Sequence, residues 1–275
     1  MAVDSTICRL HHMLARIWAG PRTNHSPAAI KAHLVMNVTG TGKQHVRLTA
    51  GKVHDRKAFR LGDWIKGRLL LLDLGYFDYR LFARIDHLGG HFITRLKKSH
   101  RLCGVDSHIK HRGPAIPVVG QWLSDVEGGL KRQSLDVQVA VRVRFRSYAG
   151  VRHAENRYLR VVGVRDEGTN QYHYYLTNIP PEQLSANDIA RTYALRWEVE
   201  KVFRELKNLY RLDELPSRKP HVVEALVLAS LLGVAASRAL RVAVECRHHS
   251  HLLPPQRWSL LFGIVAYDLL TCIVD

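Results

Sequence analysis

Three carboxylates in this 275-residue sequence stand where acids can hold divalent cations. Asp73 ends the apolar run of GRLLLLDLGY, a pattern typical of a strand buried on both faces, with the acid at its carboxyl end. Asp4 lies in AVDSTICRL, a short run that can pair beside that strand, and Glu200 lies in the helical stretch YALRWEVEKVFRELK. Two strand-end carboxylates and a helical glutamate form a ligand set for two Mg²⁺ ions, which clamp the attacking and leaving oxygens of a phosphodiester.

The charges around Glu200 also allow a simpler interpretation. On one helix at about 100° per residue, Tyr193, Glu200, Arg204 and Lys207 share a face, with Arg196 about 60° from Tyr193. The same spacing makes ordinary i,i+4 ion pairs on either side of Glu200, each contributing a few tenths of a kcal/mol. By this pattern alone, Glu200 is either a metal ligand or a solvated surface acid.

The two upstream acids have alternatives as well. Asp73 can instead cap the helix that follows it, a common position for aspartate. Asp55, in His54-Asp55, is an alternative for the first acid and ranks below Asp4 because it sits in a polar turn.

The overall charge points to a polyanionic partner. Lys and Arg number 41 against 24 Asp and Glu, which leaves a net charge of +17 and favours nucleic acid over a merely basic surface, a ribosome or a membrane surface. The four cysteines form no CxxC pair, which disfavours a disulfide framework and fits a reducing cytoplasm. No signal peptide is apparent, and the apolar stretch 225–237 is expected to be a buried helix too short to span a bilayer.

The first third of the chain alternates strand and helix signals. Residues 29–40 and 45–52 flank GTGK and predict a hairpin. After the Asp73 strand, YFDYRLFARIDHLGG predicts a helix ending at Gly89-Gly90, and HFITRLKK predicts a returning strand.

The rest of the chain is first β-rich and then helical. SLDVQVAVRVRFRSY places Val on one face and Arg on the other, and YLRVVGV with QYHYYLTN predicts a second hairpin. Helices are expected over about 184–208, 220–247 and 257–270, with Ser185 as an entry signal. We therefore predict an α/β protein in three parts: residues 1–99, a β-rich insertion over 100–178, and a helical part over 179–275.

The stretch YALRWEVEKVFRELK also resembles a family motif. Its Tyr193, Arg196, Glu200 and Lys207 have the spacing of the Tyr-Arg-Glu-Lys motif in cut-and-paste insertion-sequence transposases of the Asp-Asp-Glu type, the fourth insertion-sequence family. DSTICRL and LLLLDLGYFDYRLF resemble the segments that carry the first two acids, and LTNIP and RTNHSPAAIKAHLVMNVTG resemble the family's core. The resemblance covers nearly the whole chain and implies an RNase H-like (retroviral-integrase-like) catalytic core with a β-rich insertion before the last acid.

The resemblance implies roles for individual residues. Asp4, Asp73 and Glu200 would be catalytic and would bind two Mg²⁺ or Mn²⁺ ions, while water and then a freed 3′-hydroxyl attack phosphodiesters. The residues expected to contact DNA phosphates or bases are Tyr193, Arg196, Lys207, Arg204, Trp197, Arg95 and Lys97. Trp122 is a weaker candidate for stacking on a flipped base, with a core position equally compatible. The implied partners are transposon ends and target DNA, bound by a homodimer in the bacterial cytoplasm at the nucleoid, with no membrane.

One departure from the family pattern affects the expected activity. Asp4 lies three residues after the first residue, whereas family members carry a long upstream segment, so we expect an amino-terminally truncated transposase. Two alternatives follow: a catalytically inactive DNA-binding remnant, and a nuclease of the same fold that hydrolyses DNA without strand transfer.

Overall fold

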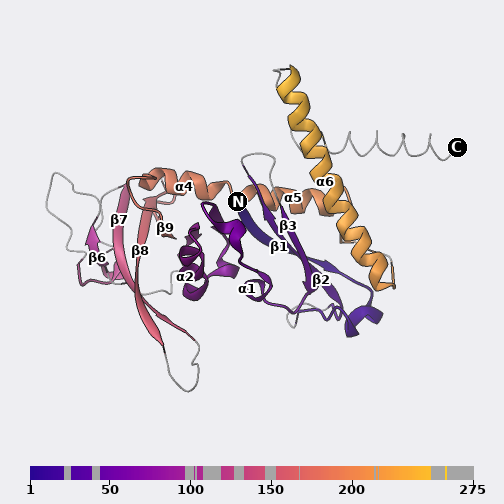
Figure 1. Cartoon of the computed structure of the whole chain (residues 1–275), viewed down its shortest axis with the longest axis horizontal. Helices are drawn as coiled ribbons and strands as arrows, with labels where there is room; N and C mark the ends of the chain where they lie inside the picture. The colour runs from indigo at the N-terminus through magenta and orange to yellow at the C-terminus, as the bar shows by residue number, and fades with distance from the viewer. Residues whose placement is uncertain are drawn as a thin grey trace. The chain divides into compact units, whose positions relative to one another are not determined.

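The computed structural model has a mixed α/β architecture (Figure 1). It describes residues 1–21, 26–38, 44–96, 102, 104–107, 119–126, 133–145, 153–166, 168–213, 215, 217–248 and 258. The chain divides into two compact units: Met1–Asp4 with His54–Trp197, and Ser5–Val53 with the residues from Glu198 onward. The three-part division by sequence order stays a prediction.

The first unit is built on a mixed sheet. Its strands, in spatial order, are the start of β1 (Ala2–Arg9), β4 (Leu69–Leu72), β5 (His91–Arg95), β9 (Tyr172–Thr177), β8 (Ala154–Arg165), β7 (Ser134–Arg144) and β6 (Gly104–Ser107). Strand β4 runs parallel to both β1 and β5, and the later pairings are antiparallel. Leu70, Leu71 and Leu72 are almost fully buried, which confirms that the apolar run before Asp73 is an interior strand.

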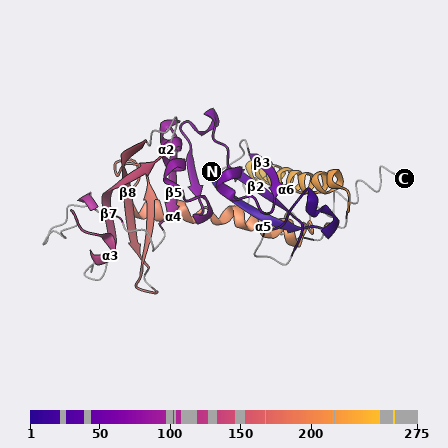
Figure 2. The ribbon, with the colours of Figure 1, turned by 90° about the horizontal axis from the view of Figure 1, so that it is seen from below.

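Several helices belong to the first unit, and two of them pack on its sheet. They are α1 (Asp55–Ala58), α2 (Tyr79–His87), α3 (Leu123–Val126) and α4 (Ala186–Ala194), with 3-10 turns η2 (Asp63–Ile65) and η3 (Leu74–Tyr76). Helix α2 packs on β5 and β7, and α4 packs on β5, β7 and β8 from the other face (Figure 2). Helix α2 begins at the capping side chain of Asp78 and ends before Gly89, whose φ of 70° suits glycine, as the sequence predicted.

The second unit contains the predicted first hairpin. Strands β2 (Ala29–Met36) and β3 (His45–Ala50) pair antiparallel, with Ile30 opposite Ala50 and Val35 opposite His45. Every residue of β2 is buried, whereas β3 is mostly half-buried. The other elements of the second unit are the later residues of β1, the 3-10 turn η1 (His12–Arg16), α5 (Trp197–Asn208) and α6 (Pro220–His248).

The helix predicted over 184–208 is interrupted, and that prediction was wrong. Helix α4 ends at Ala194 and α5 begins at Trp197. Between them, the Leu195 amide bonds the Thr192 carbonyl at 3.1 Å and the Arg196 amide bonds the Tyr193 carbonyl at 2.9 Å, a tighter i→i+3 turn. The sequence predicted that residues from Tyr193 to Lys207 share one helix face. Because the helix is interrupted, this prediction holds only for the residues of α5.

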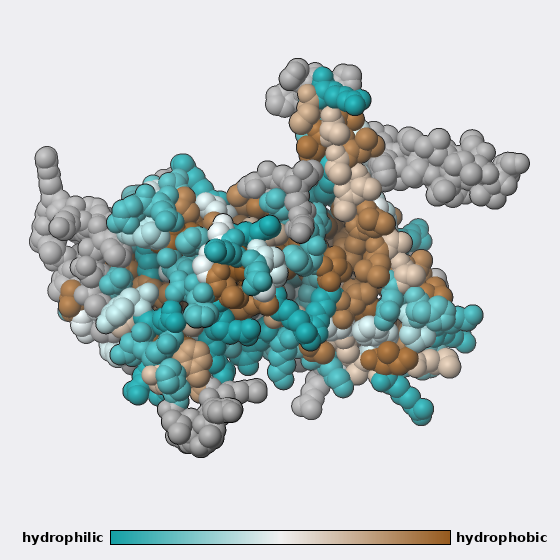
Figure 3. All heavy atoms as spheres, viewed as in Figure 1, coloured by the Kyte–Doolittle hydropathy of each residue, from teal (hydrophilic) through white to brown (hydrophobic). Residues whose placement is uncertain are grey.

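Helix α6 confirms the helix predicted over 220–247, but it corrects the expectation that its apolar stretch is buried and too short to span a bilayer. Its 29 residues include exposed leucines at 228, 232 and 240, and only 22% of its most apolar stretch is buried. Figure 3 shows apolar side chains gathered along it. By length and composition it could cross a membrane, which for a single helix is a weak indication. Of the helix expected over 257–270, only Trp258 lies within the described residues.

Candidate active site

Asp4 and Asp73 lie side by side on neighbouring parallel strands. In the β1–β4 ladder, Ala2 pairs with Leu71 and Val3 with Leu72, so the two acids are the next residues in register. Adjacent strands lie about 4.8 Å apart, which brings both carboxylates to one edge of the sheet. This confirms that the segment around Asp4 pairs beside the Asp73 strand.

The Arg196 guanidinium contacts both acids. An Nη1 atom of Arg196 lies 3.4 Å from Oδ2 of Asp4 and 3.8 Å from Oδ1 of Asp73. The Arg196 side chain is 9% exposed, while those of Asp4 and Asp73 are 18% and 39% exposed. The buried guanidinium therefore offsets part of the repulsion between the two carboxylates. The Asp73 carboxylate remains partly exposed to solvent.

Tyr193 supports this arginine from the end of α4. Its ring lies 5.7 Å from the Arg196 guanidinium carbon and 5.3 Å from the ring of Tyr175 on β9. Its hydroxyl lies 3.5 Å from the Leu72 carbonyl oxygen, and burial raises the pKa of Tyr193 to about 12. Tyr193 and Arg196 are both buried, and in this structure Arg196 contacts the two acids while Tyr193 contacts Arg196. Contact of either residue with DNA stays a prediction.

Local geometry bears on the alternatives for the two upstream acids. Asp73 precedes η3 but makes no capping hydrogen bond with its side chain, so the capping alternative is wrong. Asp55 begins α1 and its carboxylate lies 3.1 Å from the point where Gly75 would carry a Cβ atom. The acid that shares Arg196 with Asp73 is Asp4, which favours Asp4 over Asp55 as the first acid.

Glu200 and the motif residues after it belong to the second unit. Glu200 lies half-buried in the first turn of α5, and Arg204 one turn later is exposed. Lys207 is 34% exposed, and its Nζ lies 3.5 Å from Asp213. Among the residues that the structure describes, no three His, Cys, Asp or Glu side chains are grouped to hold a metal ion. Glu200 as the third acid stays a prediction.

The remaining DNA-contact candidates differ in exposure. Arg95 ends β5 in an exposed position, with Nη2 at 2.9 Å from His173 Nδ1. Trp197 is 54% exposed, with the Arg196 guanidinium carbon 5.9 Å from its ring. Trp122 is 41% exposed, so the core alternative for it is wrong. Lys97 lies outside the described residues.

Sequence reasoning missed a residue that supports Arg196 and a pair of arginines elsewhere in the first unit. Tyr175 packs on Tyr193, and its signal was only the alternation of QYHYYLTN. Arg142 and Arg144 line a hollow near the segment after Asp73, and their signal was the Val–Arg alternation of the strand that became β7.

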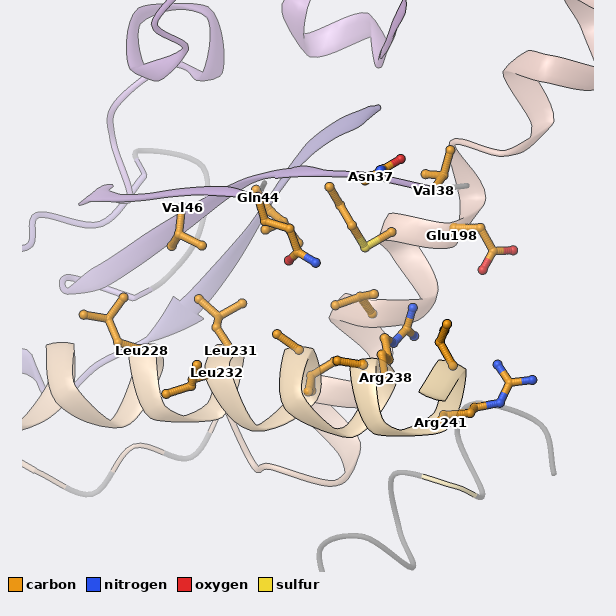
Figure 4. A pocket seen from close by; sticks show the side chains of 17 residues that line it. Asn37, Val38, Gln44, Val46, Glu198, Leu228, Leu231, Leu232, Arg238 and Arg241 are labelled. Atoms are coloured by element: carbon orange, nitrogen blue, oxygen red, sulfur yellow. The ribbon is translucent and has the colours of Figure 1, made fainter. Parts of the chain in front are cut away.

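A larger hollow lies within the second unit, between β2–β3, α5 and α6 (Figure 4). Its volume is about 750 Å³, and most of its lining is aliphatic, including Leu34, Leu228 and Leu231. The charged lining groups are Glu198, Arg238 and Arg241. With one carboxylate and two arginines in an apolar wall, this hollow lacks the paired acids needed to hold metal ions at a phosphodiester.

The chain is also similar in sequence to several known proteins. Residues 1–234 match the family model described as Transposase DDE domain. The chain is 24% identical over 268 residues to the transposase for insertion sequence element IS231C of Bacillus thuringiensis subsp. berliner, and 22% identical over 272 residues to that of IS231F of Bacillus thuringiensis subsp. israelensis. Each match covers 84% of this chain.

A shorter match is closer in sequence. Over 58 residues, or 21% of this chain, it is 40% identical to the putative transposase InsL for insertion sequence element IS186A of Escherichia coli K12. That match covers 16% of the InsL protein, and the two IS231 matches each cover 54% of their proteins. The chain thus spans about half the length of the IS231 transposases that it matches.

Proposed function

Because this chain belongs to the family of transposases with a DDE domain, we propose that it provides the catalytic core for phosphodiester hydrolysis and strand transfer at transposon ends. The observation that carries the proposal is the convergence of Asp4 and Asp73 on one cationic group, Arg196. Two acids brought together at the ends of parallel strands are a group suited to metal-dependent chemistry on DNA.

The donor set of the pair fits Mg²⁺ or Mn²⁺. Mg²⁺ is commonly bound by one or two carboxylates, with water and substrate phosphate oxygens as its other ligands. Asp4 and Asp73 would supply the carboxylates, and the exposure of Asp73 leaves one side open for water and phosphate. Two bound ions would lower the pKa of an attacking water or 3′-hydroxyl and offset charge on the leaving oxygen.

Residues of this chain have distinct proposed roles around the acids. Glu200 would be the third acid, from the first turn of α5. Arg196 would offset part of the charge of the two carboxylates in the metal-free protein, and Tyr193 would hold Arg196 in place through its ring. Exposed Arg95, Trp197 and Arg204 are available to DNA, and Lys207 would exchange Asp213 for a phosphate.

The proposal extends to the fold and the setting. The parallel set β1, β4 and β5, with an antiparallel β2–β3 hairpin, supports an RNase H-like core. Residues 100–178, which include strands β6 to β9, would be the insertion before the last acid. The net charge of +17 suits DNA as partner, and we propose a homodimer on paired transposon ends in the bacterial cytoplasm, at the nucleoid.

The test is DNA nicking and end joining with Mg²⁺ or Mn²⁺, using DNA that carries the inverted repeats found beside the gene. Asp73→Asn and Glu200→Gln should each lower the rate at least about a hundredfold, since each removes a carboxylate ligand. Glu182→Gln, at an exposed glutamate before α4, is the matched control and should keep the parent's rate. Equal cutting by all variants would refute the assignment of the acids, and cut ends that are never joined would indicate a nuclease.

The alternative is a catalytically inactive DNA-binding remnant. The observation that favours it is the position of Arg196, which already lies beside both carboxylates and offsets part of their charge. This alternative predicts salt-sensitive DNA binding without cleavage in either metal.

A further inference from the structure

An arginine-lined hollow lies in the first unit, apart from the acid pair. Its volume is about 300 Å³, at the lower end of the range of small-ligand sites. Its lining residues come from α1, from the segment between η3 and α2, from the first turn of α2 and from β7. They are Arg56, Phe77, Asp78, Tyr79, Arg80, Arg142, Val143 and Arg144. Half of these residues are arginines, so the hollow has the composition of an anion site.

The hollow keeps a positive charge after its internal ion pairs are considered. Its single carboxylate, Asp78, lies 3.2 Å from Nη1 of Arg56 and 3.5 Å from Nε of Arg80. Both of these arginines remain 43% exposed. Arg142 and Arg144 are exposed and form no ion pair within the part of the chain that the structure describes. Four guanidinium groups against one carboxylate leave a net charge of about +3, which suits more than one phosphate.

Among the described residues, the end of β7 that carries Arg142 and Arg144 is paired on one side. Strand β6 pairs with β7 only along Val137 to Val139, so among the described residues the later part of β7 has β8 as its one neighbour. Buried Val143 fixes this end of β7, and the two arginines flank it. At a strand end paired on one side, long arginine side chains can reach a ligand on either face of the strand.

An aromatic group makes the floor of the hollow rigid. Phe77 and Tyr79 meet edge to face at 5.3 Å, and Phe77 packs at 5.2 Å on Phe82, which stacks on Phe92 of β5. Burial raises the pKa of Tyr79 to about 12, so its hydroxyl remains a hydrogen-bond donor at neutral pH. A fixed floor reduces the entropy that the surrounding arginines lose when they bind an anion.

The hollow is also close to the candidate acids along the chain. Phe77 follows Asp73 by four residues, with only η3 between them. Four residues of chain span at most about 14 Å, so Phe77 lies within that distance of Asp73. A DNA strand covers such a length with about four nucleotides at roughly 3.4 Å per phosphate.

We propose that this arginine hollow binds consecutive phosphates of a DNA strand that passes Asp73. The proposal rests on the proposed function and adds to it a DNA site formed jointly by the α2 entry and by β7. Arginine suits the task because its planar fork donates two hydrogen bonds to one phosphate and keeps its charge at any physiological pH.

The test measures metal-free binding of labelled duplex and single-stranded DNA of mixed sequence over a series of salt concentrations. The double variant R142A/R144A should bind roughly tenfold more weakly and lower the salt slope by about 2, since two phosphate contacts are lost. The matched control R84A/R191A removes two exposed arginines outside the hollow and should change the slope much less. Comparing the loss of affinity for duplex and for single-stranded DNA shows which of the two forms the hollow binds.

A second variant should change DNA affinity in the opposite direction. Asp78→Asn keeps a side chain that can cap α2, while it removes the one negative charge of the hollow. It should tighten DNA binding about two- to fivefold. If R142A/R144A behaves like R84A/R191A, or if Asp78→Asn leaves binding unchanged, the hollow is not a phosphate site. A parent chain that binds no DNA would instead refute the proposed function.

Discussion

The guanidinium of Arg196 lies 3.4 Å from the carboxylate of Asp4, although 192 positions separate the two residues in the sequence. The same Nη1 atom lies 3.8 Å from Asp73. A monovalent side-chain cation thus occupies the position between two acids that a divalent ion would compete for. This competition can be measured without any catalytic assay.

Arg196→Ala should destabilise the metal-free protein and strengthen its response to Mg²⁺. Without the guanidinium, the two carboxylates repel each other, at a cost of about 1–3 kcal/mol of unfolding free energy. Mg²⁺ should then raise the Tm of this variant more than that of the parent, because no side-chain cation opposes it. Thermal unfolding with and without Mg²⁺ measures both effects, and Arg196→Lys, which keeps the charge, should respond like the parent. If Mg²⁺ raised the Tm of the parent and of Arg196→Ala by the same amount, Arg196 and Mg²⁺ would not compete for the acids.

Arg160→Met should lower the unfolding free energy by about 3–5 kcal/mol, because it leaves Asp136 buried without its partner. The two side chains are 4% and 5% exposed and are joined at 2.6 and 2.8 Å, and Arg160 also donates to the Leu184 carbonyl at 2.8 Å. Urea unfolding measures the loss.

Arg157→Met provides the matched control for that measurement. Arg157 also binds two acids, Asp86 at 2.8 Å and Glu155 at 2.6 Å, but all three side chains are about a third or more exposed. Its loss should therefore cost less than about 1 kcal/mol. Similar losses in the two variants would show that burial does not set the strength of these pairs.

The Cys8 thiol should resist modification and should make stability fall at high pH. Burial, with a smaller contribution from Asp213, raises the pKa of Cys8 from 9.0 to about 12. Above pH 9 the thiol ionises in the unfolded chain but not in the folded one, so stability is lost as pH rises from 9 towards 12. Cys8→Ala should remove this part of the pH dependence in unfolding curves.

Thiol labelling tests the same burial independently. Exposed Cys246 should be labelled in the native protein and Cys8 only after unfolding, as read by peptide mass spectrometry. Native labelling of Cys8 at the rate of Cys246 would contradict its burial.

Gly90→Ala should destabilise the first unit more than Gly89→Ala. A Cβ atom at Gly90 would overlap the side chain of Ile65 and lie 3.1 Å from its carbonyl oxygen, which should cost about 1–3 kcal/mol or more. At Gly89 the nearest atom is Lys66 Cγ at 3.6 Å, and the cost is about 1 kcal/mol for the positive φ. Chemical denaturation of both variants measures their unfolding free energies. A larger loss of stability in Gly89→Ala than in Gly90→Ala would contradict this prediction.

Local signals predicted much of the fold because they act over a few residues. The Gly-bearing turn between 29–40 and 45–52 led to the β2–β3 hairpin, and the leucine run before Asp73 led to an interior strand. Ser185 caps α4 as expected, accepting a hydrogen bond from the Asp188 amide at 3.2 Å. The interruption at Leu195 and Arg196 was missed because neither residue is a helix breaker and the tighter turn is formed by backbone bonds alone.

The sequence by itself determined which acids are candidates, since Asp4 and Asp73 were recognisable from their place in short apolar runs. Only the tertiary structure decided that Arg196 faces both of them, that Asp73 caps no helix, and that much of α6 is exposed. The physical reason is distance along the chain: strand pairing follows from the pattern within each segment, whereas the partner of a charge depends on which distant segments pack together. That packing placed a residue at 196 beside one at 4.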